Sequence, residues 1–154
     1  MRAVLLRPRN GEVSVEDVPA PTLGPGRVLI RNEYSLISAG TERARVEVAR
    51  QGLLGKARSR PDQVKQALHS IRQVGLKETF DLVNSRLDQP VPMGYSCAGV
   101  VVEVASDVDD IAAGSRVAAG GAGYANHADV VSVPKNLVVR LPDSVSARQA
   151  AFVT

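Results

Sequence analysis

The sequence is poor in the side chains on which several classes of protein depend. Its 154 residues include one cysteine, two histidines, no tryptophan and only 3% aromatic residues. A single cysteine cannot build a disulfide framework, and one cysteine with two histidines does not fill a spaced zinc motif. The scarcity of aromatic residues also removes the stacking platforms of proteins that bind single-stranded nucleic acid.

Long hydrophobic runs are absent too, and no run reaches the length of a membrane-spanning helix. The apolar stretch in the N-terminal MRAVLLRPRNGEV is broken by Arg7 and Pro8 and is too short for a secretory signal. Hydrophobic residues still make up 44% of the chain, which is enough for a buried core. We therefore expect a globular, cytoplasmic protein of one domain, with or without an elaboration.

Positive charge is concentrated in one segment. The net charge is only +3, but nine Lys or Arg residues and two acids, Glu47 and Asp62, lie between Arg43 and Lys77. Such a segment attracts anionic ligands or nucleic acid. Because Phe80 is the one aromatic residue nearby, a solvent-exposed helical face is favoured over a nucleic-acid surface. An anionic substrate or partner stays open.

The hydrophobic pattern changes twice along the chain. Residues 1–37 contain short β-like runs, RAVLL, EVSVEDV and RVLIRNEYSLI, joined by turns such as LGPG. From about residue 44 to residue 87, helical spacing predicts two amphipathic helices, the first opened by Pro61 and Asp62. From Met93 on, strands return in AGVVVEVAS and HADVVSVPKNLVVRLPD, and a last helical pattern begins in SVSARQAAFVT.

That last helical pattern stops after about two turns, with Ala150, Ala151 and Phe152 left to cover. Domains seldom end inside an amphipathic helix. We therefore expect the sequence to be the front part of a longer protein.

Three separated blocks occur in a recognisable order. They are PAPTLGPGRVLIRNEYSLISAGTE, then PVPMGYSCAGVVVEVASDVDDIAAGSRVAAG, then YANHADVVSVPKNLVVRLPDSVSARQAAFVT. They include the G-x-x-x-A-G-x-V-x-x-V spacing from Gly94 to Val104, the G-x-R-V from Gly114 to Val117, and LPD followed by AA. Together they resemble the N-terminal GroES-like catalytic domain of the medium-chain dehydrogenases/reductases, the alcohol dehydrogenase superfamily.

The resemblance covers the chain except for about residues 43–89, and the dehydrogenase half of bacterial bi-domain oxidoreductases is the nearest group. It implies a mainly β (α+β) fold: a GroES-like partial β-barrel over residues 1–154, with a basic helical insertion at about 43–89. It also implies NAD or NADP, bound in the longer protein by a following Rossmann domain. This chain would be the substrate-side domain, inactive alone, for an alcohol, carbonyl or enone-type small molecule.

The resemblance also shows which metal ligands are missing. Zinc-dependent members take one ligand from a C-G-T-D block, which here reads Ala39-Gly40-Thr41-Glu42, and others from a G-H-E block, which here reads Gly94-Tyr95-Ser96. Alanine has nothing to donate, and phenols, which titrate at about pH 10, are poor zinc ligands at neutral pH. We therefore expect no zinc.

Two hydroxyl side chains remain as candidates for catalysis. By the resemblance, Thr41 has the position whose hydroxyl contacts the substrate oxygen in alcohol dehydrogenases, and Tyr95 lies at the vacated metal position. Both could donate a hydrogen bond where negative charge develops on oxygen. Structural alternatives stay open, since Thr41 could cap a helix that starts near Glu42 and Tyr95 could fill the old pocket. Cys97 is interpreted as a small buried residue.

Other functions stay open at this point. The chain could be a non-catalytic GroES-like binding or scaffold module, or an anion- or nucleic-acid-binding protein that uses the basic helices.

The stretch from Gly120 to Gly123 is not a dinucleotide fingerprint, because no GxGxxG lies between a strand and a long helix. His69 and His127 have no adjacent nucleophile or carboxylate pair, which favours surface or core roles. The substrate, the choice between NAD and NADP, and a homo-oligomeric state are not determined by the sequence.

Overall fold

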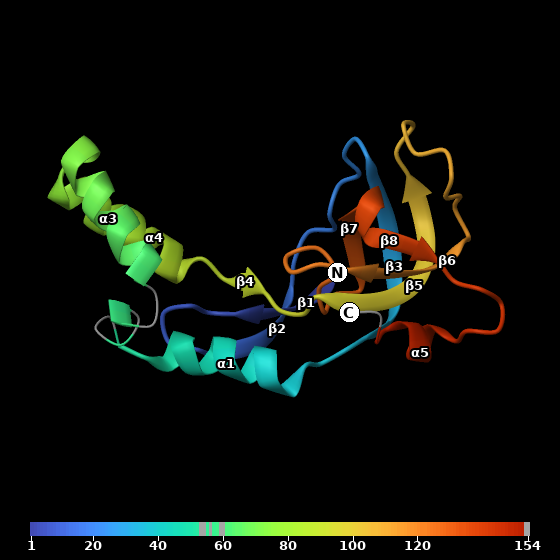
Figure 1. Ribbon diagram of the computed structural model, residues 1–154, viewed down its shortest axis with the longest axis horizontal. Helices are drawn as coiled ribbons and strands as arrows, with labels where there is room; N and C mark the ends of the chain where they lie inside the picture. Colours follow the sequence, from blue (N-terminus) through green and yellow to red (C-terminus); the bar gives the residue numbers. More distant parts are fainter. Residues whose placement is uncertain (53–54, 56, 59–60, 153–154) are drawn as a thin grey trace. The chain divides into compact units, whose positions relative to one another are not determined.

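The structure is a computed structural model, which describes residues 1–52, 55, 57–58 and 61–152 (Figure 1). The chain divides into two compact units. The first comprises Met1–Val4, Val15–Ser38 and Pro92–Thr154, and the second comprises Leu5–Ser14 and Ala39–Val91. The first unit contains the larger β-sheet, and the second contains the long helices.

The first unit is built on a five-stranded antiparallel sheet. Its strand order is β7 (Val130–Pro134), β3 (Arg27–Ser35), β5 (Ser96–Val104), β6 (Arg116–Gly120) and β8 (Val138–Arg140). A 3-10 helix, η1 (Lys135–Leu137), joins β7 to β8, and the short helix α5 (Ala147–Ala150) follows. The sheet is curled (Figure 1), which confirms the predicted mainly β, partial-barrel fold class.

Side chains on β5 and β6 alternate between two apolar clusters, because successive residues of a strand point to opposite faces. Cys97 and Val117 belong to the main core, whereas Ala98 and Ala118 pack against α5. The other buried members of the main core come mostly from β3, β7 and the loops: Val28, Ile30, Val101, Ala105, Val108, Ile111, Ala119, Ala125, Val131 and Val133. The central strands are therefore covered on both faces.

A second sheet has three strands, in the order β2 (Val13–Asp17), β1 (Arg2–Leu6) and β4 (Val91–Pro92). The predicted runs RAVLL and EVSVEDV form β1 and β2, and RVLIRNEYSLI contains β3. Strand β6 was not expected, because its segment reads as glycine-rich.

Long helices make up most of the second unit: α1 (Ala39–Arg50), α3 (Pro61–Val74) and α4 (Leu76–Asp88). The two predicted amphipathic helices are confirmed as α3 and α4. The helical segment begins before residue 43, because α1 starts at Ala39. Residues 53–54, 56 and 59–60 of the predicted basic insertion lie outside the described residues. In the described part of the chain, no helix is long and apolar enough to cross a membrane.

A single residue, Gly75, connects α3 to α4. Its φ of 95° lies in the left-handed region, and a Cβ there would come within 2.9 Å of the Glu78 carboxylate. The Gly75 amide donates to the Ile71 carbonyl (3.1 Å), while the Gly75 carbonyl accepts from the Thr79 amide (3.2 Å) and hydroxyl (2.7 Å). Gly75 therefore ends one helix and begins the next, and the two helices pack as a hairpin.

Gly99 of β5 lies against the backbone of β3, beside an irregularity in the pairing of these strands. A Cβ at residue 99 would stand 2.0 Å from the Arg31 carbonyl oxygen and 3.0 Å from Asn32 Cα. We expect Gly99→Ala to lower the free energy of unfolding by about 3 kcal/mol or more, because the two backbones must separate. Chemical denaturation of the purified chain measures this loss.

Gly40→Ala is the matched control for this experiment. A Cβ at Gly40, inside α1, meets nothing within 4 Å. The variant should be more stable than the wild type by up to about 1 kcal/mol, because alanine favours the helix. A Gly99→Ala chain with wild-type stability would contradict the close approach of β3 and β5.

Candidate active site

Tyr95 lies at a bend between β4 and β5. The preceding residue, Gly94, has a φ of 93°, and a Cβ there would come within 2.7 Å of the His127 amide nitrogen. The Tyr95 carbonyl accepts a hydrogen bond from the Gly121 amide at 2.8 Å. The backbone of Tyr95 is thus fixed on both sides, while its half-buried phenol forms no hydrogen bond with the described residues.

Three chain segments meet at the residue before Gly94. The Met93 amide donates to the Val4 carbonyl (3.0 Å), the His127 amide donates to the Met93 carbonyl (2.8 Å), and the Val4 amide donates to the His127 carbonyl (2.8 Å). Both Met93 and His127 are buried. Because each bond joins distant parts of the chain, the approach to β5 is held by tertiary contacts rather than by a local turn.

The two histidines have different environments. His127 is 8% exposed, and its Nδ1 lies 2.8 Å from the Ser35 hydroxyl oxygen. His69 is exposed on α3, where its Nε2 lies 3.0 Å from Gln73 Nε2. His127 is thus a buried histidine and His69 a surface one. That neither is catalytic stays a prediction. The position of His127 beside Gly94 was not anticipated.

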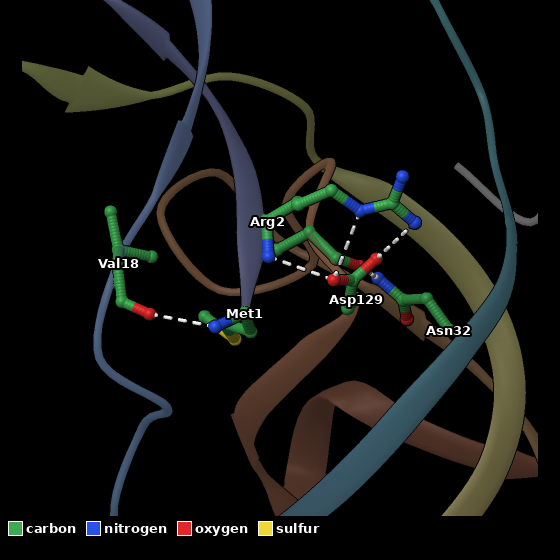
Figure 2. A network of polar contacts seen from close by, with 6 residues as sticks. Met1, Arg2, Val18, Asn32 and Asp129 are labelled. Atoms are coloured by element: carbon green, nitrogen blue, oxygen red, sulfur yellow. Dashed lines mark hydrogen bonds and ion pairs between the residues drawn. The ribbon is translucent and has the colours of Figure 1, made fainter.

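Ser35 and His127 line a groove of about 250 Å³ in the first unit. Arg2 and Asp129, which form an ion pair (Figure 2), also line the groove. The Asp129 carboxylate accepts from the Arg2 amide (2.7 Å) and from Arg2 Nη2 (3.3 Å). The neighbouring Met1 ammonium donates to the Val18 carbonyl at 2.9 Å (Figure 2). The first two residues of the chain are therefore fixed beside the groove.

Asn32 of β3 holds the segment that carries His127. Its side-chain amide donates to the carbonyls of Asn126 (3.1 Å) and Ala128 (2.8 Å), on either side of the histidine. The Oδ1 atoms of Asn32 and Asn126 are buried and have no hydrogen-bond partner among the described residues. The place of these asparagines and His127 near Gly94 was not predicted, since nothing in their spacing links them to Tyr95.

Two residues at or near the positions that hold zinc in zinc-dependent members, Ser96 and Cys97, are buried in this fold. Ser96 is fully buried, and its hydroxyl donates to the Ala151 carbonyl at 2.7 Å, just after α5. Cys97 is also fully buried, and burial raises the pKa of its thiol to about 12, so it is protonated at neutral pH. Across the residues that the structure describes, no three His, Cys, Asp or Glu side chains gather as metal ligands. Zinc independence stays a prediction.

Thr41 lies in the second unit, exposed in the first turn of α1. Because α1 starts at Ala39, Thr41 is inside the helix, and the alternative that it caps a helix starting near Glu42 is wrong. The Thr41 hydroxyl forms no hydrogen bond with the described residues. Tyr95 belongs to the first unit. The catalytic roles of Thr41 and Tyr95 stay predictions.

Residues 63–143, just over half of the chain, match the alcohol dehydrogenase GroES-like domain family. The chain belongs to this family. The matched part of this GroES-like domain includes most of α3, all of α4 and every strand from β4 to β8. No curated protein matches the sequence.

Solved quinone oxidoreductases share the fold of this GroES-like domain. The enzyme from Coxiella burnetii has a TM-score of 0.64 at 17% identity, over 98% of this chain and 40% of that one. The Escherichia coli enzyme, complexed with NADPH, has a TM-score of 0.62 at 16% identity, over 98% and 36%. The enzyme from Pseudomonas syringae pv. tomato has a TM-score of 0.61 at 21% identity, over 97% and 36%. The GroES-like domain thus spans 36–40% of these proteins, and the likeness shows a common fold.

The contact between Arg2 and Asp129 makes the stability of this domain depend on pH. Hydrogen bonds from the Arg2 backbone, and then from its side chain, hold the pKa of Asp129 below its ordinary value of 3.8. A carboxylate with a lowered pKa stabilises the folded state above its unfolded pKa, and this contribution is lost as the pH falls through the folded pKa. We expect Asp129→Asn to melt below the wild type at neutral pH, with a gap that closes below about pH 4.

Scanning calorimetry from acidic to neutral pH measures this gap. Asp143→Asn is the control, because Asp143 is exposed and forms no ion pair with the described residues. Its melting midpoint should follow the wild type throughout. A gap for Asp129→Asn that is the same at every pH would show that the charge of Asp129 contributes nothing.

Proposed function

We propose that this GroES-like domain is the substrate-side domain of an NAD(P)-dependent, zinc-independent oxidoreductase that acts on an alcohol, carbonyl or enone-type substrate. The observation that carries the proposal is Tyr95, a hydroxyl donor at the position of a missing zinc ligand. Its backbone is fixed by Gly94 and Gly121, and its phenol has no partner in the described part of the chain. Quinone oxidoreductases of similar fold from Escherichia coli and Thermus thermophilus are complexed with NADPH, which supports the cofactor class.

In this proposal, hydrogen bonds replace a metal ion in stabilising negative charge on the substrate oxygen. Such stabilisation is largest when the donor is held in place before the charge develops. Tyr95 meets this requirement through its fixed backbone, and the exposed Thr41 hydroxyl is the second proposed donor. Ser96 is excluded from this role, because its hydroxyl already donates to Ala151.

The cofactor is proposed to bind outside this chain. The glycine-rich residues 120–123 end β6 and continue into turns and then β7, so they present no long helix N-terminus to a pyrophosphate. We propose that a following Rossmann domain binds NAD or NADP, which exchanges a hydride with a small-molecule substrate. The present chain, without that domain, is then inactive.

An assay of the longer protein with NADPH or NADH and 1,4-benzoquinone tests this function, with a reaction lacking protein as the blank. We expect oxidation of the nicotinamide that chelation leaves unchanged, and a zinc content far below one ion per chain. Residues 1–154 alone should show no turnover and no calorimetric binding of either nucleotide. Chelation-sensitive turnover with about one zinc ion per chain would refute zinc independence. Micromolar binding of NADPH by residues 1–154 would refute the proposed placement of the cofactor.

Tyr95→Phe and Thr41→Val, made in the longer protein, test the two donors separately. Each change keeps the shape of the side chain and removes a hydroxyl. Loss of a donor that acts in the transition state should lower kcat about a hundredfold with little change in KM. Neither hydroxyl has a partner among the described residues, so the melting midpoint should change little.

Ser96→Ala is the control for these variants. It removes the buried hydrogen bond from Ser96 to the Ala151 carbonyl, so it should lower stability by about 1–3 kcal/mol without removing a proposed donor. A Tyr95→Phe enzyme with full turnover would remove Tyr95 from the active site. A Thr41→Val enzyme with full turnover would do the same for Thr41.

A further inference from the structure

The hairpin of α3 and α4 contains a groove of about 460 Å³ that the proposed oxidoreductase function does not use. The groove lies entirely within the second unit. Both helices line it, and the lining residues that matter here are Lys65, Ala67, Leu82, Val83 and Arg86. Its volume falls within the range of small-molecule sites, roughly 300–1,000 Å³.

The α4 side of the groove has an exposed apolar surface. Leu82, Val83 and Arg86 follow helical spacing from the buried Thr79, so they share one face of α4. Leu82 is 53% exposed and Val83 is 37% exposed. Covering such side chains with an apolar group is favourable, since it removes both surfaces from water. This part of the groove therefore favours a ligand with an apolar body.

The charged residues of the groove are cations. Lys65 near the start of α3 and Arg86 in the last turn of α4 both line it, and no acidic residue does so in the described part of the chain. Neither cation forms an ion pair with a described residue. In contrast, Arg9 pairs with Asp88 and Arg43 with Glu47 on the surface of the same unit. Two cations that have no ion-pair partner among the described residues, beside an apolar surface, favour an anionic head group.

We propose that this groove binds a small amphipathic anion, a carboxylate joined to an aliphatic or aromatic body. The carboxylate lies between Lys65 and Arg86, and the apolar body covers Leu82 and Val83. Because both cations are exposed, the attraction is modest and weakens as salt is added. This binding site contains neither Tyr95 nor Thr41 and goes beyond the oxidoreductase function proposed for the domain.

Calorimetry of residues 1–154 with three ligands that share one tail tests the proposal. The ligands are octanoate, octan-1-ol and octylammonium, at low ionic strength. We expect saturable octanoate binding that is about tenfold tighter than that of the other two, and that loses this advantage in about 0.5 M sodium chloride. Equal affinities for octanoate and octan-1-ol would overturn the proposal, as would no octanoate binding at all.

Two double variants locate the site. Lys65→Gln with Arg86→Gln should weaken octanoate binding about tenfold and leave octan-1-ol binding unchanged. Arg72→Gln with Lys77→Gln removes the same charge from the same helices at positions outside the groove, and should change neither. Circular dichroism checks that both variants keep their helices. Equal losses in the two double variants would place the binding elsewhere and overturn the proposal.

Leu82→Asn tests the apolar side of the groove. It should weaken octanoate and octan-1-ol together, because both tails would cover the same surface. Unchanged affinity for both ligands in a helical Leu82→Asn chain would also overturn the proposal.

Discussion

The close pairing of β3 with β5 is the contact on which the first unit depends. β5 is the middle strand of the five-stranded sheet and β3 is its neighbour, and at Gly99 they approach until no side chain fits between them. The same pairing fixes Ser35 at the end of β3 and the start of β5 directly after Tyr95. Through Asn32, β3 also holds the segment around His127. The surroundings of Tyr95 are thus an extension of this strand pair, not a loop with an independent structure.

Elements with a strong hydrophobic period could be predicted from the sequence, and the others could not. β3, α3 and α4 follow clear patterns of apolar residues, and each element covers nearly the same residues as its pattern. β6 contains Val117 followed by two alanines between glycines, a composition with little strand character, and becomes a strand because β5 and β8 pair with it. The start of α1 at Ala39 was missed because Thr41 and Glu42 resemble a helix cap and an acidic first turn.

The candidate site also has a part that could be predicted from the sequence and a part that could not. Tyr95 and Thr41 could be selected because the order of sequence blocks aligns them with positions of known importance in a family. The surroundings of Tyr95 could not be predicted, because backbone hydrogen bonds between Val4, Met93 and His127 leave no trace in local sequence. Ser96 illustrates the difference well. The family resemblance implies a metal position there, whereas the folded chain uses the Ser96 hydroxyl to attach the residue after α5 to the sheet.

The burial of Cys97 has a practical consequence for spectroscopy. It is the one cysteine of the sequence, it is fully enclosed by the core, and its thiol stays protonated at neutral pH. Reagents that attack thiolates should therefore leave the folded wild-type chain unlabelled. A cysteine introduced at an exposed position such as Gly40 or Asp143 would carry a fluorophore or spin label selectively. Site-specific probes can thus be attached without first replacing a residue of the core.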